Sequence, residues 1–292
     1  MIALLLTLTS PQLAPQAGEP ELLLTGFTEV HRVARIDAPE PTVTSIDVGR
    51  LDGIDDAHCG RFGTTDECKP LRDGRWLVAS SGGAVAVLEA GGSRASFSTL
   101  VPNAHSVELL PGGRLVSAAS TLREGNRLLV HDLATGALLQ QFALTSAHGV
   151  HYRPEDERLY ALGMAHLCVY LVDGESGELR FERRHGLPEG ADASGHDLSP
   201  VPGTGELIVT THAHVWLFDL RSASFRRHPQ LGDLSHVKSV DVHPTTGRIA
   251  YVQANDEHWW SEAVQFLHPA GELRLPGEHF YKARWAAARD ER

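Results

Sequence analysis

One motif recurs five times along the 292-residue chain, with successive copies 39 to 48 residues apart. Each copy has a polar start, a short apolar strand, a turn rich in Pro, Gly or Asp, and a second β-rich strand. The copies start at Asp66, His105, His148, His196 and Lys238. Strand-rich repeats of this length are typical of the four-stranded blades of a β-propeller. The sequence therefore predicts an all-β fold with a single β-propeller domain.

The number of blades depends on how the two ends of the chain meet. Residues 280–285, Phe-Tyr-Lys-Ala-Arg-Trp, follow the last repeat start by the usual interval but leave too little chain for a blade. We expect this segment to pair with strands in residues 21–37, because an unpaired edge would expose backbone donors and acceptors. The result is about six blades of four strands in residues 19–292. Seven blades are the alternative if residues 21–61 hold additional strands.

The first 18 residues are a short apolar run followed by small and Pro-rich residues, as in a signal peptide, although no Lys or Arg precedes the run. We therefore expect a secreted or periplasmic protein, with a trimmed gene start as the alternative. A net charge of −11 without any basic stretch argues against nucleic acid and membranes as partners. No later segment has the roughly 20 apolar residues of a spanning helix, and we expect a soluble monomer.

The chain has three cysteines. Cys59 and Cys68 flank a short Gly-containing loop, and we expect them to form a disulfide if the protein is exported. Cys168 lies in an apolar run and is expected to be a buried strand residue. No CxxC motif occurs, which disfavours thiolate zinc sites and thioredoxin-like redox chemistry.

Repeat symmetry predicts where a functional site would form. In a propeller the loop before each innermost strand lies beside the central channel, so equivalent positions of successive blades converge there. Four such positions are expected to share one site: His105, His148, His196 and Lys238. Side chains from the remaining blades are expected nearby: Glu67, Lys69, Tyr281 and Lys282. The alternative is that the histidines only brace neighbouring blades through hydrogen bonds.

Five motifs in fixed order carry a resemblance to a known family: Asn103-Ala-His-Ser-Val, Ala147-His-Gly-Val, Gly195-His-Asp-Leu, His236-Val-Lys-Ser-Val and Phe280-Tyr-Lys-Ala-Arg-Trp. Together, over residues 21–285, they resemble a bacterial family of exported propellers of unknown function. The resemblance implies the fold and export more than any chemistry. At the level of fold the chain is also similar to oligogalacturonate lyases, which are propellers with a His-rich metal site in the channel.

The residue types at the predicted site suit two kinds of ligand. Three neutral imidazoles can hold a divalent transition metal, Mn or Zn, and we expect His105, His148 and His196 to be its ligands. Lysines suit an anionic substrate, and paired tryptophans can stack on sugar rings, with core packing as the alternative for the tryptophans. The expected substrate-binding residues are Lys69, Lys282, Glu67, Trp259 and Trp260.

These features favour one function and leave another open. The first hypothesis is a carbohydrate-active enzyme, a lyase or hydrolase that acts on an acidic saccharide. In this hypothesis Lys238 or Lys282 neutralises the substrate carboxylate, and Tyr281 or His151 moves the proton. The alternative is a protein without catalytic activity that binds a small anionic ligand or a protein partner.

Overall fold

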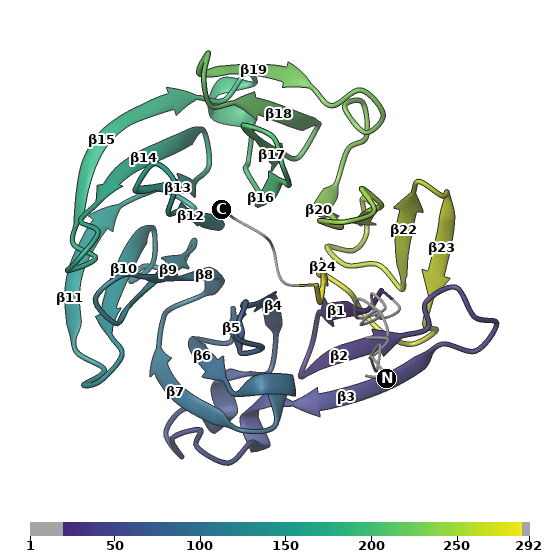
Figure 1. Ribbon diagram of the computed structural model, residues 1–292, viewed down its shortest axis with the longest axis horizontal. Coiled ribbons are helices and arrows are strands. Elements are labelled where there is room, and N and C mark those ends of the chain that lie inside the picture. The colour runs from purple at the N-terminus through teal and green to yellow at the C-terminus, as the bar shows by residue number, and fades with distance from the viewer. Residues whose placement is uncertain (1–19, 288–292) are drawn as a thin grey trace, which may run out of the picture.

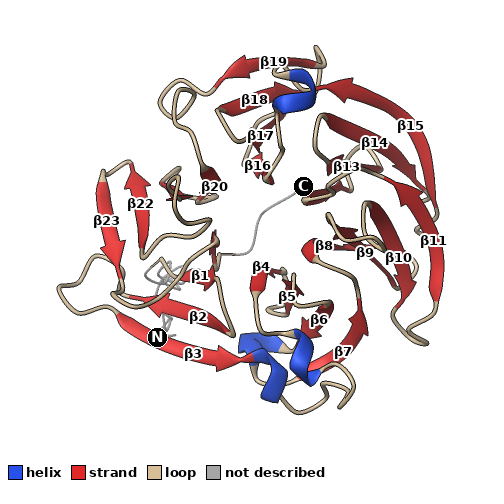
Figure 2. Cartoon of the chain, turned by 180° about the vertical axis from the view of Figure 1, so that it is seen from behind, coloured by secondary structure: helices blue, strands red, loops and turns tan. Residues whose placement is uncertain are grey.

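Six four-stranded antiparallel sheets surround a central axis in the computed structural model, which describes residues 20–287 (Figure 1). The prediction of an all-β propeller with six blades is confirmed, and the alternative of seven blades is wrong. Helix in the described residues is limited to four short turns, blue in Figure 2: η1 (Val48–Arg50), η2 (Cys59–Arg61), η3 (Ala90–Gly92) and η4 (Gly190–Asp192). None of the helices in this part of the chain has the length and apolar character needed to span a membrane. The expected signal peptide, residues 1–18, lies outside the described residues.

Each blade begins with an inner strand at the axis and ends with an outer strand at the rim (Figure 1). Five blades each use four consecutive strands. The first two blades are β4 (Thr65–Pro70), β5 (Trp76–Ser80), β6 (Ala84–Leu88) and β7 (Ala95–Leu100), followed by β8 (Ala104–Leu110), β9 (Arg114–Ala119), β10 (Arg127–Asp132) and β11 (Leu138–Ala143). The next three are β12 (Gly149–Arg153), β13 (Arg158–Leu162), β14 (His166–Val172) and β15 (Leu179–Gly186); β16 (Asp197–Val201), β17 (Glu206–Thr210), β18 (Val215–Asp219) and β19 (Ser224–Arg227); and β20 (Val237–Val242), β21 (Ile249–Gln253), β22 (Ala263–Leu267) and β23 (Gly271–Arg274). The sixth blade combines both ends of the chain: β24 (Lys282–Trp285), β1 (Leu22–Thr25), β2 (Glu29–Ala34) and β3 (Thr42–Asp47).

Strand β24 closes the ring by pairing with β1, as predicted; Figure 1 shows the yellow strand beside the purple one. The two strands are antiparallel, with Leu24 opposite Ala283 and Leu22 opposite Trp285. All four side chains are buried in one apolar cluster that includes Phe266 of the neighbouring blade. Burial of apolar surface, worth about 25 cal/mol per Å², thus holds the two ends of the ring together.

The inner strands alternate apolar and polar side chains. One set packs between blades and is buried and apolar: Cys68, Val107, Val150, Leu198, Val240 and Ala283. The residues before this set form a middle tier on the axis: Glu67, Ser106, Gly149, Asp197, Ser239 and Lys282. The residues after it form a lower tier: Lys69, Glu108, His151, Ser199, Asp241 and Arg284. Because side chains of a strand alternate between its two faces, one sequence pattern packs the blades and also gathers charge on the axis.

The predicted disulfide between Cys59 and Cys68 is wrong, because all three cysteines are free in the structure. Cys68 lies on β4 and points into the apolar cluster between blades, where it packs with Val78. Cys59 belongs to η2, and its thiol donates a hydrogen bond to the carbonyl of Asp55 at 3.6 Å. Cys59 is partly buried and packs against the same apolar cluster, so both cysteines contribute to this cluster without a bond between them. Cys168 is buried on β14, as expected.

Candidate functional site

One residue at or just before the start of each inner strand forms a mouth tier next to the middle tier: Asp66, His105, His148, His196, Lys238 and Tyr281. These positions include all five repeat starts found in the sequence. Three of them, in β4, β8 and β20, are the extra residues of β-bulges, where the register of the strand pairing shifts. A bulge re-aims its side chain and is often found beside a functional site.

The three histidine rings of the mouth tier contact one another. The ring centroids of His105 and His148 are 4.2 Å apart, and those of His148 and His196 are 5.5 Å apart. The ring of Tyr281, on the closing strand, lies 5.9 Å from that of His105. The structure thus brings together the residues that repeat symmetry places together, although they come from four blades.

Burial keeps these imidazoles uncharged. It lowers the pKa of His148 to about 4 and lowers the pKa of His105 and His196 well below the usual range. The positive charge of Lys238 lowers all three pKa values further. Burial also lowers the pKa of Lys238, to about 8, so this side chain is mostly an ammonium at neutral pH. The mouth tier therefore presents neutral imidazoles beside a cation.

Lys238 and His196 leave hydrogen-bond donors without acceptors. The Lys238 ammonium donates to Nε2 of His196 at 3.1 Å, so that nitrogen holds a lone pair and the ring proton lies on Nδ1. Nδ1 of His196 is buried and has no hydrogen-bond partner among residues 20–287. Within the same residues, the bond to His196 is the only side-chain hydrogen bond of Lys238. Lys238 is 6% exposed and forms no ion pair with a carboxylate of residues 20–287. Buried donors are normally satisfied, so the mouth tier lacks an acceptor.

Two further histidines extend the cluster, and neither was predicted. His212 follows β17, and its ring centroid lies 6.4 Å from that of His196 and 4.3 Å from that of His236. His236 precedes β20, and its Nε2 lies 2.9 Å from Oδ1 of Asp256. His236 lies two residues before the repeat position Lys238, and this nearness was the sequence signal that could have indicated it. His212 lies in a loop between the second and third strands of its blade, where the repeat gives no indication.

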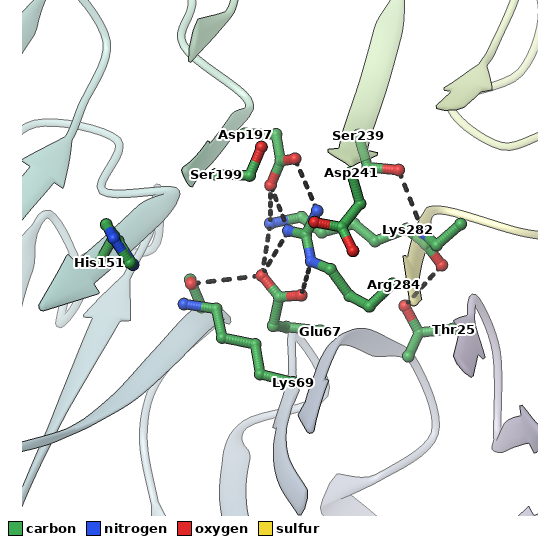
Figure 3. A network of polar contacts seen from close by, with 12 residues as sticks. Thr25, Glu67, Lys69, His151, Asp197, Ser199, Ser239, Asp241, Lys282 and Arg284 are labelled. Atoms are coloured by element: carbon green, nitrogen blue, oxygen red, sulfur yellow. Dashed lines mark hydrogen bonds and ion pairs between the residues drawn. The ribbon is translucent and has the colours of Figure 1, made fainter. Parts of the chain in front are cut away.

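Next to the mouth tier, a buried network of ion pairs fills the axis (Figure 3). Arg284 bridges two carboxylates: its Nε and Nη2 donate to Glu67 at 2.7 and 2.9 Å, and its Nη1 donates to Asp197 at 2.9 Å. Nζ of Lys282 lies 3.2 Å from Glu67 and 3.1 Å from Asp197. All four side chains are at most 1% exposed. Within this network, two cations balance two anions.

The charges in this network are mutually stabilised. Burial alone would raise the pKa of Glu67, but the neighbouring cations, Arg284 foremost, outweigh it and lower the pKa to about 2. The same balance holds the pKa of Asp197 well below its usual range. Glu67 and Lys282 were expected to bind substrate. The structure pairs them with each other inside the fold.

Lys69 and His151 lie one tier further from the mouth. Lys69 donates to the carbonyl of Val150 at 2.5 Å and to Glu108 at 3.2 Å. His151 is 3% exposed, and its Nδ1 lies 3.9 Å from the same Glu108 carboxylate. Figure 3 shows both side chains beside the network of buried ion pairs. The structure therefore does not bring these two predicted site residues to the histidines of the mouth tier.

The two predicted tryptophans lie in the loop between β21 and β22. Trp259 is 41% exposed, stacks on Phe27 with a centroid distance of 5.6 Å, and contacts Tyr281 edge-on at 5.6 Å. Trp260 is less exposed; it stacks on the ring of His258 at 4.5 Å and contacts the tilted ring of His279 at 3.6 Å. Trp259 thus borders the mouth tier, whereas Trp260 supports the loop.

Residues 37–290 match the family described as a family of unknown function, DUF6528. The chain belongs to this family. Among curated proteins, no sequence matches this DUF6528 chain. Two solved structures share its fold: a chain from the crystal structure of a nidogen/laminin complex and a protein of unknown function from Bacteroides caccae. Each has a TM-score of 0.63 and 10% sequence identity, and each match covers 92% of this chain and 99% of the other chain. At that identity the similarity concerns the fold alone.

Metal binding by the DUF6528 chain stays a prediction. In the described part of the chain, no group of three or more His, Cys, Asp or Glu side chains is placed to hold a metal ion. Elemental analysis of the purified protein for Mn and Zn tests this prediction.

Replacement of His148 with glutamine is expected to remove part of the acid sensitivity of the fold. The pKa of His148 is about 4 in the folded protein against about 6.5 when exposed, so the unfolded chain binds more protons between these values. The contribution of the neutral ring to the free energy of unfolding is therefore at its full value above about pH 6.5 and decreases as the pH falls towards 4. Relative to the variant, the wild type is expected to lose about 3 kcal/mol of unfolding free energy between pH 7 and pH 4.

Urea unfolding of both proteins at the two pH values measures this difference. The control is His258→Gln, which changes an exposed imidazole and is expected to leave the pH dependence of the wild type unchanged. Identical pH dependence of wild type and His148→Gln would show that the ring is solvated in the folded protein.

Proposed function

We propose that this DUF6528 protein binds a small carboxylate-bearing ligand at the mouth tier, with Lys238 as the anchor. The observation that carries the proposal is the pair of unsatisfied donors on Lys238 and on Nδ1 of His196. A carboxylate supplies two oxygens that only accept hydrogen bonds. Hydrogen bonds between an ammonium and a carboxylate are about twice as strong as neutral ones.

The surrounding charges support an anionic ligand. The ion pairs of the middle and lower tiers balance Lys282 and Arg284 against Glu67 and Asp197, so these cations are already paired. Burial raises the pKa of Asp66, the carboxyl group of the mouth tier, to about 7. A substantial part of its negative charge is therefore absent at neutral pH, which reduces repulsion of an incoming carboxylate.

Calorimetric titration with galacturonate and with galactose tests this proposal, because the two sugars differ in the carboxylate. We expect galacturonate to bind and galactose to bind at least about tenfold more weakly, since a charge-assisted hydrogen bond contributes about 1.5–3 kcal/mol. Equal affinities would contradict an ammonium anchor. Failure of both sugars to bind would favour the protein-partner alternative.

A lyase acting on an acidic saccharide is the second candidate, favoured by the contact between Tyr281 and an uncharged His105. In a β-elimination, Lys238 would neutralise the carboxylate and His105 would take the proton from the carbon beside it. The bond from the neighbouring carbon to the glycosidic oxygen would break, and that oxygen would take a proton from Tyr281. Burial raises the pKa of Tyr281 well above its usual range, so its phenol stays protonated. The unsaturated product absorbs in the ultraviolet, which makes turnover of polygalacturonate measurable.

The proposed function also includes export, supported by the apolar and Pro-rich composition of residues 1–18. Exported binding proteins and carbohydrate-active enzymes meet acidic saccharides outside the cytoplasm. Cell fractionation, with determination of the N-terminal residue of the mature protein, tests the location.

A further inference from the structure

Trp259 and Phe27 form an exposed aromatic platform on two neighbouring blades. Phe27 lies in the loop between β1 and β2, and Trp259 lies in the loop between β21 and β22. Each side chain is 41% exposed, and their rings stack with an interplanar angle of 25°. Large aromatic side chains left partly in water on a soluble protein often mark a place where a ligand binds.

The platform is held rigidly by further aromatic contacts. The His279 ring lies 4.7 Å from Phe27 and 3.6 Å from Trp260. Trp260 in turn stacks on His258 with an interplanar angle of 9°. Side chains that are already ordered lose little conformational entropy when a ligand binds, so a rigid platform increases affinity.

The platform and the mouth tier are continuous. Tyr281 contacts Trp259 at 5.6 Å on one side and His105 at 5.9 Å on the other. Lys238, on β20, belongs to the same blade as the loop that carries Trp259. A ligand anchored at Lys238 can therefore extend over Tyr281 onto the platform without leaving this face of the propeller.

We infer that the ligand is an oligosaccharide of uronic acids that occupies two adjoining subsites, one at Lys238 and one on Trp259. This inference rests on the proposed function, because the first subsite is the carboxylate site. The mouth tier offers neutral imidazoles, and Nδ1 of His196, which has no partner in residues 20–287, can donate a hydrogen bond to a sugar hydroxyl. The apolar face of a sugar ring packs on an aromatic ring such as Trp259.

Titration of the full chain with galacturonate and with trigalacturonate tests the second subsite. In the wild type, trigalacturonate is expected to bind at least tenfold more tightly than galacturonate. In Trp259→Ala this gain is expected to fall below threefold, while affinity for galacturonate changes less than twofold. The matched control is Phe181→Ala, which removes a 53% exposed aromatic ring on the outer strand β15 and is expected to leave both affinities unchanged.

The outcomes separate the two proposals. If galacturonate binds and trigalacturonate binds no more tightly, or if Trp259→Ala keeps the full gain, the second subsite is overturned and the carboxylate site stands. If neither compound binds the wild type, the carboxylate site fails and the inference fails with it. Loss of both affinities in Phe181→Ala would show that the variants report on folding, and would overturn the assignment to Trp259.

Discussion

Replacement of Arg284 with methionine is expected to lower the free energy of unfolding by about 3–5 kcal/mol, because it leaves a carboxylate buried without its partner. Arg284 is the side chain that hydrogen-bonds both Glu67 and Asp197, and the three residues are at most 1% exposed. Lys282 remains, but one ammonium cannot neutralise two buried carboxylates. For a domain of this size the loss corresponds to a decrease in Tm of roughly 10 °C, measurable by calorimetry and by urea unfolding.

Two control proteins distinguish this effect from loss of an arginine in general. Arg226→Met breaks an exposed ion pair with Glu206, 2.7 Å long, and is expected to cost less than about 1 kcal/mol. Adding Glu67→Gln to Arg284→Met is expected to restore part of the lost stability, because the buried charges again balance. If Arg284→Met were as stable as Arg226→Met, the axial network would not contribute to the fold as described.

Replacement of Lys238 with methionine is expected to weaken galacturonate binding by about 10- to 100-fold, because a charge-assisted hydrogen bond contributes about 1.5–3 kcal/mol. Methionine keeps much of the apolar length of the side chain and removes the charge. Stability is expected to change little, since Lys238 has no carboxylate partner in residues 20–287 that its loss would leave unpaired. Calorimetric titration measures the affinity, and thermal unfolding of the same sample shows that the variant is folded.

The pH dependence of binding gives an independent measurement. The pKa of Lys238 is about 8, so affinity for the carboxylate is expected to decrease above about pH 8, by up to tenfold per pH unit, as the ammonium loses its proton. Lys238→Arg keeps its charge and is expected to retain binding at about pH 9.5. Affinity that is constant between about pH 7 and pH 9.5 in the wild type, or unchanged in Lys238→Met, would contradict the anchor.

The sequence is sufficient to predict the fold because every blade repeats one pattern. The polar starts from Asp66 to Lys238 mark five inner strands, and the fragment around Tyr281 predicts how the ring closes. The disulfide prediction failed because nearness of two cysteines in the sequence does not determine where their side chains point. Cys68 lies on an inner strand, where the alternation of side chains places it between blades, and Cys59 packs against the same apolar cluster as a free thiol.

The candidate site was predictable only where it follows the repeat. His105, His148 and His196 occupy equivalent positions, so symmetry brings their rings into contact. The structure places Glu67 and Lys282 on the axis and pairs them with each other. Arg284 bonds Glu67 as well; it belongs to the closing motif, but the sequence analysis gave it no role because it lies three residues after the repeat position. His212 belongs to a connecting loop, whose conformation depends on neighbouring blades rather than on the repeat.

The closing strand also determines when the ring is complete during synthesis of the chain. Tyr281, Lys282 and Arg284 all lie on or next to β24, the last of the described strands to leave the ribosome. Until then a nascent chain can form five blades, but Glu67 and Asp197 lack the cations that neutralise them, and the mouth lacks its sixth side. Domains generally fold as units, and here the axial network is incomplete until the closing strand is present. A chain interrupted before residue 281 would therefore keep an unpaired edge on β1 and two carboxylates without the cations that balance them in the complete ring.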